Sequence, residues 1–69
     1  MSKRSVTIAG HRTSISLEDP FWQALQEIAA ARQLSLAALV AEIDKTRGEH
    51  NLSAALRIHA LAWFKDNRR

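Results

Sequence analysis

The side chains able to carry out chemistry are scattered along this chain rather than gathered in one place. The three histidines are far apart, and no two are three or four residues apart, as two metal ligands on one helix would be: His11, His50 and His59. The acidic residues do not form a converging pair for general acid–base catalysis. Cysteine is absent, and the only glycines, Gly10 and Gly48, cannot build a glycine-rich phosphate loop. We therefore expect no catalytic residues, no metal and no cofactor.

Three polar side chains at every second position offer a different chemistry, that of recognition: Arg12, Ser14 and Ser16. Successive side chains of a β-strand point to opposite faces, so these three share one face. The residues between them are apolar or β-branched and face the other way: Thr13, Ile15 and Leu17. The alternation predicts a half-buried strand over residues 11–17. Helical patterns follow it, so we expect this strand to pair with a strand outside its own chain.

Residues 1–10 form a basic segment whose structure the pattern leaves open. Val6 and Ile8 alternate with polar residues, but their parity is opposite to that of Ile15 and Leu17. One unbroken strand would therefore place them on the face of Arg12. A break at Gly10 resolves the conflict. We predict an amino-terminal arm or edge extension here, either a strand or a flexible segment.

Positive charge is concentrated at the two ends of the chain. Residues 1–16 carry three cations and no acid, whereas residues 17–63 carry four cations and six acids. Among the last six residues, three cations accompany one acid. The asymmetry favours a polyanionic partner near the strand, although short basic ends can also serve solubility alone.

Three helices are predicted after the strand. The first covers residues 20–33, with Asp19 as N-cap and Pro20 in the first helical position. The second covers 35–47 with Ser35 as N-cap, and the third covers 51–65 with Asn51 or Ser53 as its cap. The third helix is apolar on several sides, so we expect it to need more packing partners than its own short chain offers.

The size of the chain points to association. A 69-residue domain buries a low fraction of its surface, and without cysteines oligomerisation is the remaining means of stabilisation. No apolar segment approaches the roughly 20 residues of a membrane span, and the first ten residues lack the apolar core of a signal peptide. We expect a cytoplasmic protein with no membrane partner.

The strand and the two helix starts together resemble the ribbon-helix-helix family, of which Arc and MetJ are members. The resemblance rests on residues 12–17 (RTSISL), 19–22 (DPFW) and 34–36 (LSL), and the flanking residues 5–11 and 51–57 are similar to small stand-alone bacterial proteins of this family. It implies a mainly α fold with one short strand. Two chains would form an intertwined homodimer with an intermolecular two-stranded antiparallel ribbon, a core at residues 11–47 and an additional third helix.

The resemblance also implies roles for individual residues. The outward ribbon positions that contact DNA bases correspond to Arg12, Ser14 and Ser16. Phosphate contacts correspond to the start of the second helix, with basic residues near the amino end added: Ser35, Leu36, Ala37, Lys3, Arg4 and His11. The core shared by the two chains corresponds to eleven side chains: Thr13, Ile15, Leu17, Phe21, Trp22, Leu25, Ile28, Leu36, Leu39, Val40 and Ile43.

The function implied is that of a homodimeric, sequence-specific protein that binds double-stranded DNA, a transcriptional repressor or autoregulator with its ribbon in the major groove. Serine is a short and permissive hydrogen-bonding group, so base reading at two of the three ribbon positions should be shallow. The alternative is a dimeric protein-interaction module or antitoxin-like protein that holds a protein partner through the apolar third helix.

Overall fold

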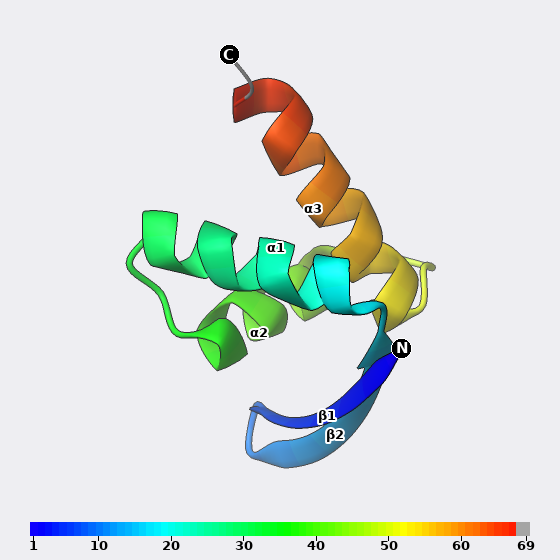
Figure 1. Cartoon of the computed structure of the whole chain (residues 1–69). Helices are drawn as coiled ribbons and strands as arrows, with labels where there is room; N and C mark the ends of the chain where they lie inside the picture. The colour runs from blue at the N-terminus through cyan, green and yellow to red at the C-terminus, as the bar shows by residue number, and fades with distance from the viewer. Residues whose placement is uncertain (68–69) are drawn as a thin grey trace.

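A β-hairpin and three helices make up the fold of residues 1–67, which are the residues described by the computed structural model (Figure 1). The elements follow one another as β1 (Ser2–Ile8), β2 (His11–Leu17), α1 (Asp19–Ala31), α2 (Leu36–Thr46) and α3 (Leu52–Asn67). Figure 1 shows the hairpin on one side of the helices and the second half of α3 extending away from it. Within the described residues, no helix has the length and apolarity needed to cross a membrane. Arg68 and Arg69, part of the basic carboxyl end, lie outside the described residues.

The first ten residues contain the partner strand that the sequence analysis did not find. β1 pairs antiparallel with β2 in a register that runs from Ile8 opposite His11 to Ser2 opposite Leu17. The two-residue turn between them has positive φ angles at both positions, 51° at Ala9 and 82° at Gly10. Such a turn matches the right-handed twist of the strands and closes a tight hairpin. The two-stranded antiparallel ribbon is thus confirmed.

Its origin differs from the expectation in two respects. The chain contains two strands rather than one, and the prediction that strand 11–17 has no partner in its own chain was wrong. The ribbon described here is formed within one chain, because Ser2–Ile8 is a strand rather than a flexible arm. The homodimer itself stays a prediction.

The turn also resolves the conflict of parity between the two strands. Directly opposed residues of an antiparallel pair lie on the same face, so Val6 and Ile8 share the face of Ile15 and Leu17. All four side chains are buried, at 8% exposure or less. The hairpin therefore has one apolar face, which packs on the helices, with α2 against β1 and α3 against β2.

One hydrophobic core joins the hairpin to all three helices. Of the eleven side chains expected in a shared dimer core, eight are buried within the single chain, and Thr13, Phe21 and Leu36 are half-buried. Trp22 is fully buried at the centre, and its indole N–H donates a hydrogen bond to the Ser2 carbonyl at 3.0 Å. The Arg4 guanidinium lies 5.2 Å from the centre of the same ring. These two contacts attach the start of β1 to α1.

The ends of α1 differ from the sequence prediction. The N-cap is Glu18 rather than Asp19, and the Asp19 carboxylate accepts a hydrogen bond from the Ser2 hydroxyl instead of capping the helix. At the other end Gln33 takes a positive φ of 59°, a conformation that glycine more often supplies. The N–H of Leu34 then bonds to the Ala29 carbonyl at 2.8 Å, so the chain turns two residues earlier than predicted.

The starts of α2 and α3 are fixed by side-chain caps. The Ser35 hydroxyl accepts a hydrogen bond from the N–H of Ala38 at 3.0 Å, which confirms the predicted cap. Of the two candidate caps of α3, Asn51 is the one used, since its side-chain oxygen accepts from the N–H of Ala54 at 2.8 Å. Ser53 instead donates to the Ser16 carbonyl at 3.2 Å. The start of α3 is thereby attached to the end of β2.

An ion pair attaches the middle of α3 to the junction between β2 and α1. The Arg57 guanidinium donates two hydrogen bonds to the Glu18 carboxylate, at 2.9 and 3.3 Å. The hydrogen bond from Arg57 holds the pKa of Glu18 below its ordinary value. The folded state therefore favours the deprotonated carboxyl.

The burial of Ile15 generates a test of the hairpin. Ile15→Lys should unfold the protein, because it buries an uncompensated charge where the side chain is 3% exposed, a cost of more than about 3 kcal/mol. Ser14→Lys, the neighbouring position on the exposed face, should leave stability within about 0.5 kcal/mol. Thermal unfolding followed by circular dichroism measures both. Equal melting temperatures for the two variants would contradict this account of the hairpin.

The Glu18–Arg57 ion pair can be tested through the pH dependence of stability. Because the folded pKa of Glu18 is depressed, its contribution to stability is complete above the ordinary pKa of about 4.3 and is lost as the pH falls through the folded value. Glu18→Gln should therefore melt at a lower temperature than wild type at pH 7. The difference should disappear at pH values below the folded pKa. A difference that does not change between pH 7 and pH 2 would show that the ion pair contributes nothing to stability.

Candidate nucleic-acid interface

The face of the hairpin turned away from the helices is polar along its whole length. It consists of three cross-strand pairs: Lys3 with Ser16, Ser5 with Ser14, and Thr7 with Arg12. Ser16 is half-buried and the other five side chains are exposed. We name these six residues the ribbon face.

The three predicted base-contacting residues do lie together on the ribbon face, and β1 doubles their number. Ser5 and Thr7 were missed by the sequence analysis, because residues 1–10 were treated as an arm. A signal for them was present, since they alternate with Val6 and Ile8, and Gly10 follows at hairpin spacing. Lys3 was expected to contact phosphate and lies on the same face as Arg12.

The geometry of the ribbon face suits a grooved partner. The two cations lie on different strands and at opposite ends, Lys3 at the open end of the hairpin and Arg12 beside the turn. Between them are four hydroxyl groups, each able to donate and to accept a hydrogen bond. Adjacent strands are about 4.8 Å apart, and a two-stranded ribbon fits the DNA major groove, which is about 12 Å wide.

Electrostatics distinguish the hairpin from the helical body. Residues 1–17 contain three cations and no acid. In the helical body, arginines are paired with acids, as in Arg32 with Glu42 and Arg47 with Asp44. The hydrogen bond from Arg32 lowers the pKa of Glu42, so that carboxylate stays ionised beside its partner. Within residues 1–67, neither Lys3 nor Arg12 forms an ion pair, so their charge remains available to a polyanion.

Two other residues predicted to contact phosphate lie away from the ribbon face. Arg4 stands opposite Ile15 on the inner side of the hairpin, where its guanidinium covers Trp22. His11 stands opposite Ile8, also on the inner side, and lines a hollow with Asp44. The structure therefore does not bring either of them together with Lys3. Among the described residues, no three histidine or acidic side chains gather as a metal site would require.

The start of α2, predicted to hold a phosphate, belongs to a different element from the ribbon face. Ser35 is occupied as the cap, and Leu36 and Ala37 are half-buried in the first turn. The first N–H groups of a helix have no acceptor within the helix, and they carry the positive end of its dipole. Since α2 packs against β1, this helix is adjacent to the hairpin.

The outer edge of β2 is partly open. With a two-residue turn, Ile8 and His11 form a hydrogen-bonded pair, so the N–H and C=O groups of Arg12, Ser14 and Ser16 point away from β1. The Ser16 carbonyl accepts from Ser53. The groups of Arg12 and Ser14 form the remaining edge, which is a place where a further strand can add.

Comparison with known proteins places this arrangement in a family. A family model described as a ribbon-helix-helix domain matches residues 1–64, which include the hairpin, α1, α2 and most of α3. No curated protein and no solved structure gives a significant match. Domains of this family are generally DNA-binding transcription regulators that dimerise. With a model that covers nearly the whole chain, and with the antiparallel ribbon followed by helices, the chain belongs to the ribbon-helix-helix domain family.

Proposed function

We propose that this protein is a sequence-specific DNA-binding regulator of the bacterial cytoplasm, a transcriptional repressor or autoregulator, that places its ribbon face in the major groove. The observation that carries the proposal is the ribbon face itself. It has six polar side chains, two cations without ion pairs among residues 1–67, and no acid, on a hairpin whose opposite face packs on the helices through four buried apolar side chains.

Arg12 provides base discrimination in this proposal. A guanidinium can donate two parallel hydrogen bonds to the O6 and N7 atoms of guanine, a pattern that no other base pair presents in the major groove. Arg12 is exposed and is the only arginine on the ribbon face. Ser5 and Ser14 stand opposite each other at its centre, and such short side chains let the hairpin backbone come close to the bases.

Lys3 and the start of α2 position the hairpin on the sugar–phosphate backbone. An ammonium group displaces counterions from phosphate without reading sequence. The N–H groups of Leu36 and Ala37, at the positive end of the α2 dipole, can donate hydrogen bonds to a phosphate oxygen. These contacts set the register of the ribbon face and make the affinity dependent on salt.

The binding form in this proposal is a homodimer. A chain of this size gains stability from association, and proteins of the family typically dimerise. Two copies bring two ribbon faces to one DNA, and they double the cationic contacts. A dimer with two-fold symmetry binds a palindromic site, since the two half-sites are related by the same symmetry.

A second candidate function is favoured by one observation on α3. Ile58, Leu61 and Phe64 are large apolar side chains that remain exposed in the single chain. A dimeric interaction module or antitoxin-like protein would use such a surface to hold a different protein. Salt-dependent binding to duplex DNA separates the two candidates, because only the first requires it.

Site selection from random duplexes tests the proposal directly. The wild-type chain should enrich a short, palindromic motif, and the affinity for that motif should fall steeply between 50 and 200 mM salt, in proportion to the number of phosphates contacted. Selection that enriches no motif at either salt concentration would overturn the assignment of a sequence-specific regulator.

Removal of the two ribbon-face cations should give different results. Arg12→Ala should weaken binding to the selected site by about 1–3 kcal/mol and relax the preference at one base position. Lys3→Ala should weaken binding to all duplexes alike. It should also reduce the slope of log affinity against log salt concentration by about one unit. Fluorescence anisotropy against the selected duplex and its single-base variants measures both. Lys45→Ala, an exposed lysine of α2, is the matched control and should change neither quantity appreciably.

The inclusion of β1 in the ribbon face has its own test. Ser5→Glu introduces a negative charge at the centre of the face, and it should reduce DNA affinity by at least about tenfold through repulsion of phosphates. Gln23→Glu adds the same charge at an exposed position of α1 and should have a much smaller effect. If the two variants bind DNA equally well while remaining folded, β1 does not face the DNA.

A further inference from the structure

Thr7 carries the only methyl group on the ribbon face. The other five side chains of this face end in a hydroxyl, an ammonium or a guanidinium group: Lys3, Ser5, Arg12, Ser14 and Ser16. Thr7 is exposed, whereas its two neighbours in β1, Val6 and Ile8, are buried against the helices. The ribbon face therefore has one side chain that offers both an apolar contact and a hydrogen bond.

The register of the hairpin places Thr7 directly opposite Arg12. Ile8 and His11 flank the two-residue turn as a hydrogen-bonded pair. The next pair, Thr7 with Arg12, is therefore of the non-hydrogen-bonded kind, in which the Cα atoms are only about 4.5 Å apart and the side chains lie close together. Successive bases along one DNA strand are about 3.4 Å apart. When the guanidinium binds one base, Thr7 lies beside the neighbouring base pair.

The centre of the ribbon face lets the backbone come close to the base edges. Ser5 and Ser14 oppose each other there and are both exposed. Their hydroxyls can donate or accept, so they discriminate little between bases. The 5-methyl group of a pyrimidine projects into the major groove, where a short side chain can reach it. A threonine methyl can pack on that group, and a serine hydroxyl cannot replace this apolar contact.

The strand holds the threonine side chain in place before DNA binds. Two heavy atoms on Cβ restrict rotation about χ1, and threonine favours extended backbone. β1 is attached to the helices by the buried Val6 and Ile8 and by the hydrogen bond from Trp22 to the Ser2 carbonyl at 3.0 Å. A contact made by Thr7 therefore loses little side-chain freedom on binding.

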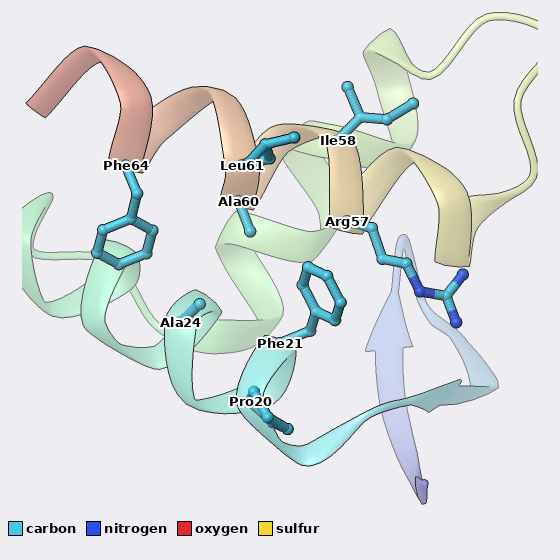
Figure 2. A pocket seen from close by; sticks show the side chains of 8 residues that line it. All are labelled: Pro20, Phe21, Ala24, Arg57, Ile58, Ala60, Leu61 and Phe64. Atoms are coloured by element: carbon cyan, nitrogen blue, oxygen red, sulfur yellow. The ribbon is translucent and has the colours of Figure 1, made fainter. Parts of the chain in front are cut away.

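Other exposed apolar groups lie off the ribbon face. An apolar groove of about 340 Å³ lies between α1 and α3, and no residue of the hairpin lines it. Figure 2 shows Phe21 of α1 and Phe64 of α3 in this groove. Ala9 also exposes a methyl group, but it belongs to the turn. A methyl contact between the ribbon face and a base thus depends on Thr7.

We propose that Thr7 is a specificity-determining residue that contacts the 5-methyl group of a pyrimidine in the base pair next to the guanine bound by Arg12. The threonine methyl packs on the base methyl, and the hydroxyl on the same Cβ hydrogen-bonds to the exocyclic group at position 4 of that base. The inference rests on the proposed function, because it requires the ribbon face to lie in the major groove. The recognised unit is a guanine and an adjacent 5-methylpyrimidine.

Two bases present this chemistry, thymine and 5-methylcytosine. Uracil and cytosine are the same bases without the methyl group. At position 4 thymine has an acceptor oxygen and 5-methylcytosine a donor amino group, and a hydroxyl can serve either one. Pairs of duplexes that differ only in the methyl group therefore isolate the contact.

Deletion of the methyl group on either side tests the contact. In the duplex obtained by site selection, uracil replaces the thymine in the base pair next to the guanine whose preference is relaxed by Arg12→Ala. Wild type should bind the uracil duplex about fourfold more weakly, as expected for the loss of one buried methyl contact. This comparison needs no protein variant, so it does not depend on the folding of one.

Thr7→Ser removes the protein methyl and keeps the hydroxyl. It should lower affinity for the thymine duplex by a similar factor, about fourfold, and it should no longer distinguish thymine from uracil. Because Thr7 is exposed, the circular dichroism spectrum should not change. Thr46→Ser makes the same change at an exposed position of α2. It is the matched control and should keep the preference for thymine.

A cytosine series separates the two sources of the methyl group. A C·G pair is placed at the same position, with and without the 5-methyl group. Tighter binding of the methylated duplex by wild type, but not by Thr7→Ser, would show that either base supplies the contact. A methyl effect confined to the thymine series would assign it to thymine.

Three results overturn this contact while salt-dependent binding to the selected duplex leaves the proposed function standing. They are a selected motif with no thymine beside the guanine, equal affinity of wild type for the thymine and uracil duplexes, and a preference for thymine that persists in Thr7→Ser. Absence of any salt-dependent binding to duplex DNA would instead overturn the proposed function, and this contact with it.

Discussion

The fold depends on the two-residue turn at Ala9 and Gly10. Positive φ angles at both positions reverse the chain within one tight turn, and this reversal lets β1 satisfy the inner edge of β2. It also places the four apolar strand residues on one face, so the hairpin can contribute to the core. A chain of 69 residues has few elements that can cover its core. Loss of the hairpin would therefore expose both the inner edge of β2 and the core.

The same turn creates the candidate site. Because the inner face packs on the helices, every second side chain of both strands is turned to solvent. These outward residues carry hydroxyl groups and two cations that form no ion pair within residues 1–67. The helical body complements this arrangement, because Glu18, Glu42 and Asp44 neutralise arginines locally. Positive charge is thereby left on the hairpin. One face of the small sheet thus packs on the core, and the other carries the polar groups and the two cations.

Local patterns in the sequence predicted what depends on neighbouring residues. The face of Arg12, Ser14 and Ser16 and the cap at Ser35 followed from periodicity and from short-range hydrogen bonding. The β1 strand was missed because Ala9 is unusual where a turn needs positive φ, and the opposite parity of the two strands was taken as a break. The groove depends on where α1 and α3 meet, which requires tertiary distances that no local pattern contains.

The hydrogen bond from Ser53 to the Ser16 carbonyl has a consequence for the behaviour of the protein at high concentration. An unpaired strand edge invites other chains to add without limit, as in fibrils. Here the start of α3 occupies one end of the β2 edge, and the turn at Gly10 closes the other. The edge of β2 left between them is only a few residues long. A serine that looks like a second cap of α3 therefore leaves fewer groups on the β2 edge to which another chain can add.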